Sequence, residues 1–146
     1  MSSTRRECLA LGAAALLLLR PAHATPEALR AAISSFAGGQ QVREGRITLD
    51  IATLVENGNA VPITVTVQSP MTAADHVSTV ALFNERNPQH DVAVFQLGPR
   101  AGRAVVATRM RLATSQTIVA MARMADGSCW MQSVEVIVTL AACIEG

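Results

Sequence analysis

The chain has 146 residues, half of them hydrophobic, with 12 basic and 11 acidic side chains. This length suits one domain, and the near-neutral charge gives no electrostatic case for binding nucleic acid or an anionic membrane. Lysine is absent from the sequence, which excludes Schiff-base chemistry by a lysine side chain. The sequence also has no metal-ligand spacing, nucleophile elbow or glycine-rich phosphate loop. We therefore expect no metal, no cofactor and no independent hydrolase.

Residues 1–24 have the order of an export signal. Arg5 and Arg6 precede the apolar run Leu9–Leu19, and Ala22-His23-Ala24 forms an A-x-A cleavage site. The apolar run is too short to span a bilayer. The arginine pair resembles a twin-arginine signal, with a general secretory signal as the alternative. Because this segment carries three arginines and one glutamate, the mature chain keeps 9 basic and 10 acidic residues. We expect it to be soluble and periplasmic.

Residues 25–40 predict one short N-terminal helix. Apolar residues recur at steps of three and four between Pro26 and Phe36. Thr25 is suited to cap this helix, with Pro26 at its first position, and Gly38-Gly39 is suited to end it.

Residues 41–140 predict a β-sandwich domain. Segments of alternating or apolar residues are separated by turn signals such as Asn57-Gly58-Asn59, with no helical pattern between them. The strand-like segments are residues 46–51, 61–68, 77–83, 91–97, 103–111, 117–124 and 129–140. A further strand is allowed within Ile51–Glu56. The fold class is therefore all-β, an immunoglobulin-like antiparallel β-sandwich with one short N-terminal helix and a flexible C-terminal arm.

Two features of this domain each allow two interpretations. The segment 117–124 is apolar on nearly both faces, which fits either a sandwich core or a surface that awaits a partner. Four methionines gather in the same third of the chain: Met110, Met121, Met124 and Met131.

Arg109 and Arg111 share a face if their strand is regular, and such a pair suits an oxyanion. A solvated strand face is the alternative.

The C-terminal residues stand out because a cysteine follows the last strand closely. Val134, Val136, Val138 and Leu140 alternate with Glu135, Ile137 and Thr139, a period of two that predicts a half-buried strand. Three residues beyond Leu140 reach at most about 10 Å, so Cys143 lies on a short tether. A frayed terminus with an incidental cysteine is the alternative.

Cys129 is the other cysteine of the mature chain, at the opposite end of the same predicted strand. At about 3.3 Å per residue a continuous strand separates Cys129 from Leu140 by over 30 Å, which excludes a disulfide with Cys143. An unpaired thiol in an exported protein indicates use.

Several motifs together resemble the SoxY family, the sulfur-carrier subunit of the thiosulfate-oxidising Sox system. The motifs cover essentially the whole mature chain: Glu56-Asn57-Gly58-Asn59-Ala60-Val61-Pro62, Val65 with Gln68-Ser69-Pro70-Met71-Thr72, Phe83-Asn84-Glu85-Arg86-Asn87-Pro88, Thr108-Arg109-Met110-Arg111-Leu112-Ala113 with Gln116, and Asp126-Gly127-Ser128. The resemblance implies a non-enzymatic carrier whose C-terminal cysteine, here Cys143, holds the sulfur substrate covalently. It also implies a heterodimer with a SoxZ-like β-sandwich subunit, and passage of the cargo between a haem sulfur transferase and a sulfate thiohydrolase.

The carrier arm, residues 141–146, departs from the family pattern. SoxY proteins typically end in Gly-Gly-Cys-Gly-Gly, whereas this chain ends Ala141-Ala142-Cys143-Ile144-Glu145-Gly146. Alanines restrict the backbone relative to glycine, Ile144 adds bulk beside the thiol, and Glu145 disfavours a nearby thiolate. The competing functions are a periplasmic binding or structural module with an incidental cysteine and, more weakly, a thiol-redox enzyme, against which the absence of C-x-x-C argues.

Overall fold

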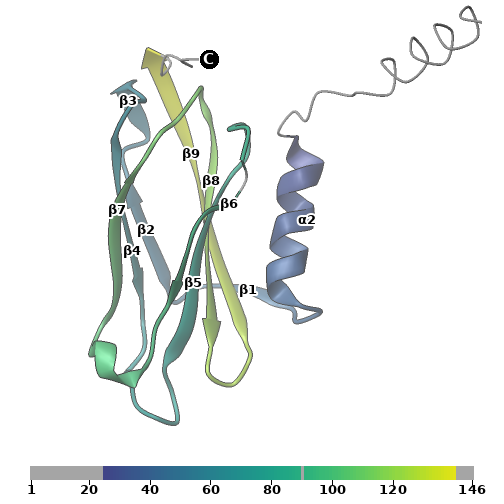
Figure 1. Ribbon diagram of the computed structural model, residues 1–146, viewed down its shortest axis with the longest axis vertical. Helices are drawn as coiled ribbons and strands as arrows, with labels where there is room; N and C mark the ends of the chain where they lie inside the picture. Colours follow the sequence, from purple (N-terminus) through teal and green to yellow (C-terminus); the bar gives the residue numbers. More distant parts are fainter. Residues whose placement is uncertain (1–24, 90, 141–146) are drawn as a thin grey trace, which may run out of the picture.

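The computed structural model describes residues 25–89 and 91–140. Two β-sheets pack face to face, and one helix lies against the outer face of the larger sheet (Figure 1). The export signal expected over residues 1–24 lies outside the described residues.

Nine strands and two helical segments make up the described part of the chain. Their bounds in chain order are α2 (Pro26–Ala37), β1 (Val42–Glu44), β2 (Ile47–Ile51), β3 (Leu54–Asn57), β4 (Val61–Val67), β5 (Val77–Asn84), β6 (Asp91–Gln96), the 3₁₀ helix η1 (Pro99–Ala101), β7 (Ala104–Met110), β8 (Gln116–Met124) and β9 (Cys129–Leu140). The larger sheet has the order β1-β9-β8-β5-β6, with β3 also paired to β9, and the smaller sheet has the order β2-β4-β7. The predicted all-β sandwich with one N-terminal helix is confirmed.

The structure adds two short strands that run parallel to β9. β1 pairs with the start of β9, from Val42 opposite Cys129, and β3 pairs with its end, up to Asn57 opposite Leu140. β3 is the further strand that the sequence allowed, whereas β1 was not predicted. Three residues cannot show the alternation by which a strand is recognised. The remaining strand pairs are antiparallel, as expected.

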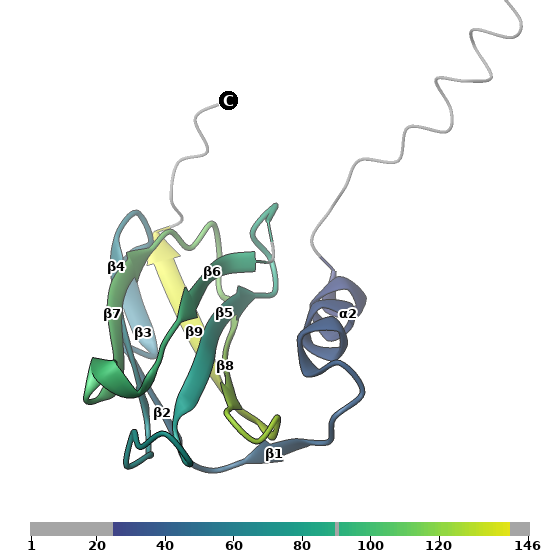
Figure 2. The same ribbon diagram turned by 60° about the horizontal axis from the view of Figure 1, so that its bottom comes forward.

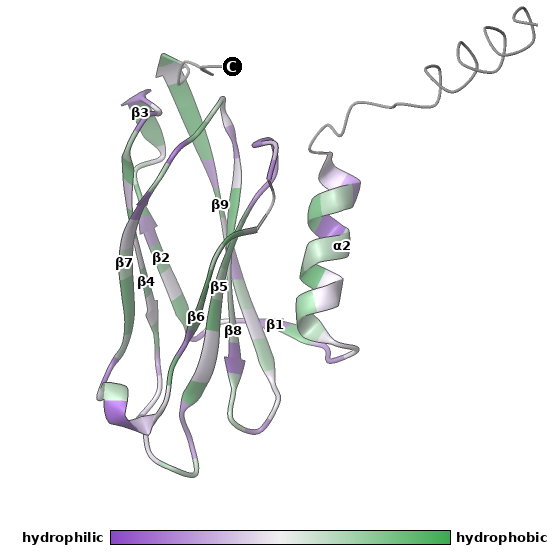
Figure 3. Ribbon diagram, in the orientation of Figure 1, coloured by the Kyte–Doolittle hydropathy of each residue, from purple (hydrophilic) through white to green (hydrophobic). Residues whose placement is uncertain are grey.

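Strict alternation of burial marks the strands β2 and β4 of the smaller sheet. In β2 and β4 every second residue is buried, and these residues meet the inward face of the larger sheet. The resulting core is aliphatic, with Ile63, Leu82 and Ile118 among its fully buried side chains. Figure 3 shows hydrophobic residues on the strands of both sheets.

The helix α2 begins and ends where its caps predict. The Thr25 hydroxyl accepts a hydrogen bond from the Ala28 amide, Pro26 opens the helix, and Gly38 closes it in the left-handed conformation at φ 59°. From the side seen in Figure 2, α2 stands beside the larger sheet and is joined to β1 by a short connection.

The position of α2 shows which of the two interpretations of residues 117–124, a sandwich core or a surface that awaits a partner, is correct. The inward side chains of β8 belong to the sandwich core, while Val119 and Met121 on its outer face are buried in a second cluster with Leu29 of α2. Arg123, also on β8, donates a hydrogen bond to the Phe36 carbonyl and lies 4.6 Å above the Phe36 ring. The apolar outer face is therefore covered by the chain's own helix and does not await a partner.

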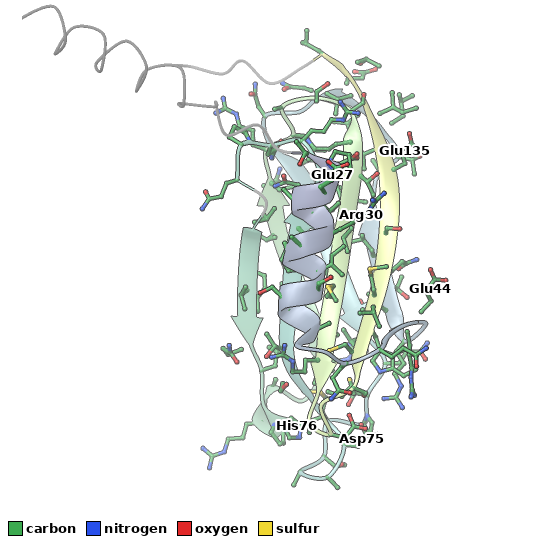
Figure 4. The ribbon with its side chains drawn as sticks, turned by 90° about the vertical axis from the view of Figure 1, so that its right-hand side faces the viewer. Glu27, Arg30, Glu44, Asp75, His76 and Glu135 are labelled. Carbon is green, nitrogen blue, oxygen red and sulfur yellow. The ribbon has the colours of Figure 1, made fainter. Side chains whose placement is uncertain are left out.

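The loops fall into two groups at the two ends of the sandwich. β9 runs toward the end formed by the β3–β4 turn, the β5–β6 loop and the β7–β8 loop, which we call the arm end. The far end holds residues 68–76, η1 and the β8–β9 hairpin; Figure 4 shows Asp75 and His76 there.

Candidate functional site

The predicted carrier arm, residues 141–146 with Cys143, lies outside the described residues, but the strand that carries it is described to its last residue. β9 ends at Leu140, three residues before Cys143. Leu140 was expected on the buried side with Val136 and Val138, and this expectation is wrong, because its side chain is 65% exposed. The strand overshoots the rim of the sandwich, so its final residue has no opposing sheet to pack against.

Gly58 in the β3–β4 turn joins the end of β9 to the β7–β8 loop. Its amide donates to the Leu140 carbonyl at 3.4 Å, and its carbonyl accepts from the Leu112 amide at 2.8 Å. A Cβ atom at Gly58 would lie 2.2 Å from the Leu112 carbonyl oxygen and 3.3 Å from a methyl group of Val138. Only glycine fits between these two elements.

A second link to β9 comes from Ser115 in the β7–β8 loop. Its hydroxyl accepts from the Val138 amide at 2.8 Å and lies 3.4 Å from the Val138 carbonyl oxygen. On the opposite side, the Thr139 hydroxyl lies 3.5 Å from the carbonyl oxygens of Val55 and Glu56 in β3. The last residues of β9 are thus held from both sides.

Side-chain amides join the β5–β6 loop to the β7–β8 loop. Asn87 donates to the Arg111 carbonyl at 2.6 Å and accepts from the Ala113 amide at 3.0 Å and from the Gln116 side chain at 2.8 Å. Gln116, which is buried, in turn accepts from the Arg86 amide at 2.9 Å. Asn84, also buried, accepts from the Asn87 amide at 3.1 Å. Buried amides whose donors and acceptors are satisfied in this way rigidify the loops that they join.

The arginine pair proposed from the sequence is only partly on a strand. β7 ends at Met110, so Arg109 lies on β7 while Arg111 begins the β7–β8 loop. Both residues are exposed at the arm end, and the Arg111 carbonyl is held by Asn87. The regular strand on which a shared face depended is therefore not present at Arg111, and the exposure of both side chains agrees with the alternative of a solvated surface.

Cys129 is a free cysteine with a fully buried side chain at the start of β9. Its sulfur lies 3.9 Å from the Ala37 carbonyl oxygen and 3.8 Å from that of Gly127. Because β9 is continuous over twelve residues, about 35 Å separates its two ends. The prediction that Cys129 cannot pair with a cysteine three residues past Leu140 follows from this geometry. The four methionines singled out in the sequence also lie in or against the two buried clusters.

At the far end, charged side chains surround Trp130. The guanidinium carbons of Arg43 and Arg46 lie 5.9 and 5.2 Å from its ring centroid. Hydrogen bonds from the hydroxyl and amide of Ser128, with a smaller contribution from the charges of Arg46 and Arg43, hold the pKa of the Asp126 carboxyl below its usual value.

One exposed apolar pair lies close to the base of the arm. Leu54 of β3 and Ile137 of β9 are register partners on the outer face of the larger sheet, and they are 62% and 53% exposed. α2 stands over β5 and β8 and does not cover them; in Figure 4 Glu27 and Arg30 mark the upper half of α2, and Glu135 of β9 lies to its side.

Within residues 25–89 and 91–140, no three histidine, cysteine or carboxylate side chains gather in a way that could hold a metal ion. No helix in this part of the chain has the length and apolarity needed to cross a membrane.

Together these observations define a class: an immunoglobulin-like sandwich whose last strand is firmly held at the rim, a few residues before a cysteine. Comparison with known proteins identifies the family. The model of the family "Sulfur oxidation protein SoxY" matches residues 33–143. The chain therefore belongs to the SoxY family, and the resemblance seen in the sequence is confirmed.

Solved structures agree with the family assignment. The sulfur carrier protein SoxY from Chlorobium limicola f thiosulfatophilum is 28% identical, with a TM-score of 0.65, over 77% of this chain and 96% of that one. A superoxide reductase (neelaredoxin) from Ignicoccus hospitalis is 18% identical, with a TM-score of 0.57, over 78% of this chain and 93% of that one. At that identity the second likeness shows a shared fold alone. No curated protein matches the chain.

Analysis of the sequence missed the hydrogen-bonded loops around the end of β9. Gly58 was given as part of a turn signal, Asn87 and Gln116 only as parts of the family resemblance, and Ser115 was not singled out. Polar residues in loops usually predict solvated turns, and their partners here lie 23 to 30 positions away in the sequence. The one available signal was that three of the family motifs, remote from one another in the sequence, contain such a residue.

Proposed function

We propose that this protein is a periplasmic sulfur carrier that holds thiosulfate-derived sulfur covalently on Cys143 and presents it to partner enzymes of thiosulfate oxidation. The observation that carries the proposal is the family match, which runs through Cys143 itself. The end of β9 supports the proposal, because this strand ends at Leu140 and Cys143 follows three positions later in the sequence. The carrier holds the bound sulfur and presents it to the partner enzymes, and these enzymes perform the catalysis.

The chemistry needed from the carrier is that of a thiolate. The Cys143 thiolate and the outer sulfur of thiosulfate form a sulfur–sulfur bond, and two electrons pass to an oxidising haem partner. Hydrolysis by a second partner then releases sulfate and leaves the outer sulfur on Cys143. Glu145 is two residues away in the sequence, and its negative charge disfavours both the thiolate form of Cys143 and an anionic adduct by charge repulsion.

Intact-mass analysis of the mature protein tests this function. After incubation with thiosulfate and the partner enzymes, the wild-type mass should increase by one adduct, and Cys143→Ser should show none. Cys129→Ala is the matched control and should keep the adduct, because Cys129 is fully buried. An unchanged wild-type mass, or an equal adduct in Cys143→Ser, would refute the carrier function and favour a binding module with an incidental cysteine.

We further propose that a second β-sandwich subunit of the SoxZ type contacts the exposed pair Leu54 and Ile137. The pair is apolar, in register and near the arm base, as expected for a small docking surface. Ile137→Ser should weaken co-purification with that subunit. Val94→Ser is the matched control, because Val94 is similarly exposed on the opposite edge strand β6. Equal binding by both variants would exclude this surface.

A further inference from the structure

Five residues at the arm end form a hydrogen-bonded network that the carrier chemistry does not itself require. We call Gly58, Asn84, Asn87, Ser115 and Gln116 the collar. Its bonds join three loops to one another and to the last three residues of β9. At the far end, the side-chain hydrogen bonds of residues 68–76 and 125–128 reach no further than six positions along the chain, so the collar links loops through side chains in a way that these turns do not.

We infer that the collar residues are positioning residues of the carrier, which fix the point and direction in which the chain leaves the sandwich after Leu140. This inference rests on the proposed carrier function. It extends that function by assigning to particular residues the orientation with which the thiol reaches an enzyme.

The geometry supports a positioning role because two of the collar's links act directly on the backbone of β9 and the others hold those two in place. Ser115 holds the Val138 amide at 2.8 Å, and Gly58 holds the Leu140 carbonyl at 3.4 Å. Both residues are fixed in turn: Leu112 binds Gly58, and Asn87 binds the β7–β8 loop that contains Ser115. A change of position in either loop would therefore move the backbone of β9 at its last residues.

The effect should be large for so short an arm. Cys143 is only three positions after Leu140 in the sequence, so the direction of the backbone at Leu140 is set close to the thiol. Misplacement of a reacting group by about 1 Å can lower an enzymatic rate by up to about 100-fold. A small molecule that attacks the thiol from any direction has no such requirement.

The test compares Ser115→Ala with Ser78→Ala in the mature protein and its partner subunit. Both serines donate to or accept from backbone, but the Ser78 hydroxyl bonds the Arg123 carbonyl at 3.0 Å, away from the collar. We expect Ser115→Ala to lower the kcat/KM of enzymatic loading about tenfold. Its thiol should react with a small disulfide reagent at the wild-type rate, and Ser115→Thr should restore loading. Ser78→Ala should load normally.

A second measurement is independent of loading. Spin labels on Cys143 and on Thr48→Cys, an exposed site on β2, report the distance between the arm and the smaller sheet. The distribution should be broader in Ser115→Ala than in Ser78→Ala. An equal width in folded variants, or an equal fall in the rate with the small reagent, would overturn the positioning role. Failure of the carrier function would show separately, as the absence of any adduct on the wild type.

Discussion

The two ends of the sandwich are built by different means. At the arm end, side-chain hydrogen bonds join residues that lie 23 to 32 positions apart in the sequence, in addition to local bonds such as that between Asn84 and Asn87. At the far end, the side-chain hydrogen bonds of residues 68–76 and 125–128 join residues no more than six positions apart, and the two loops are linked to each other through the backbone, from the Ala125 amide to the His76 carbonyl. Local bonds shape a turn, whereas remote bonds fix turns relative to one another.

The two ends also differ in how much polar surface they bury. The far end is completed by surface interactions, such as the ion pair between Arg46 and Asp75 at 3.8 Å, whose side chains are both partly exposed. Interactions of this kind contribute little and adapt easily. The arm end instead buries the amides of Asn84 and Gln116, which is costly unless every bond is made. A carrier gains from that rigidity only where its arm begins.

Gly58→Ala at the arm end should cause the largest loss of stability. The added Cβ would lie 2.2 Å from the Leu112 carbonyl oxygen, so the turn and the β7–β8 loop must separate. We expect a loss of about 3 kcal/mol of unfolding free energy, measured by urea denaturation, because overpacking against backbone relaxes poorly.

Gly98→Ala is the control for that change. Gly98 is at the far end at φ −149°, and no atom would lie within 4 Å of its Cβ. Its effect should stay within about 0.5 kcal/mol. Similar losses in the two variants would show that the arm end is no more tightly packed than the far end.

Gln116→Leu should cause a smaller loss of stability. Leucine fills a similar volume but leaves the Arg86 amide and one Asn87 acceptor site without their partner. An unsatisfied buried group costs about 1–3 kcal/mol, so we expect a loss of about 2 kcal/mol in the same urea experiment. Gln68→Leu, at an exposed position of the far end, should leave stability nearly unchanged. A neutral Gln116→Leu would contradict the role given to the network.

The sequence predicts the two ends unequally, for a physical reason. Strands, caps and hairpin turns depend on neighbours within a few residues, so β4, α2 and the Asp126–Ser128 turn could all be predicted. The collar depends on pairs such as Asn87 with Arg111, whose contact is created only by the packed sheets. Leu140 was misplaced for a related reason, because alternation shows which face a residue takes but not where the opposing sheet stops.

The far end should tolerate the loss of a cation over Trp130. Arg46→Met keeps the aliphatic stem but removes the guanidinium 5.2 Å from the ring and the ion pair with Asp75. We expect a loss of about 1 kcal/mol in thermal or urea unfolding, with loading of Cys143 unchanged. Arg103→Met, at an exposed position beside η1, is the control. Slower loading in Arg46→Met alone would mean that the far end also acts on the arm.

The smallest effect should be the pH dependence contributed by Asp126. Hydrogen bonds from Ser128, and more weakly the charges of Arg46 and Arg43, lower the pKa of this exposed carboxyl in the folded protein. A lowered folded pKa means that the stabilisation is present above the unfolded pKa of about 4 and is lost as the pH falls through the folded value. The difference in melting temperature between wild type and Asp126→Asn should therefore be steady at neutral pH and shrink in acid. If that difference grew in acid, or if Asp126→Asn altered loading at neutral pH, the far end could no longer be treated as a set of local turns without influence on the arm.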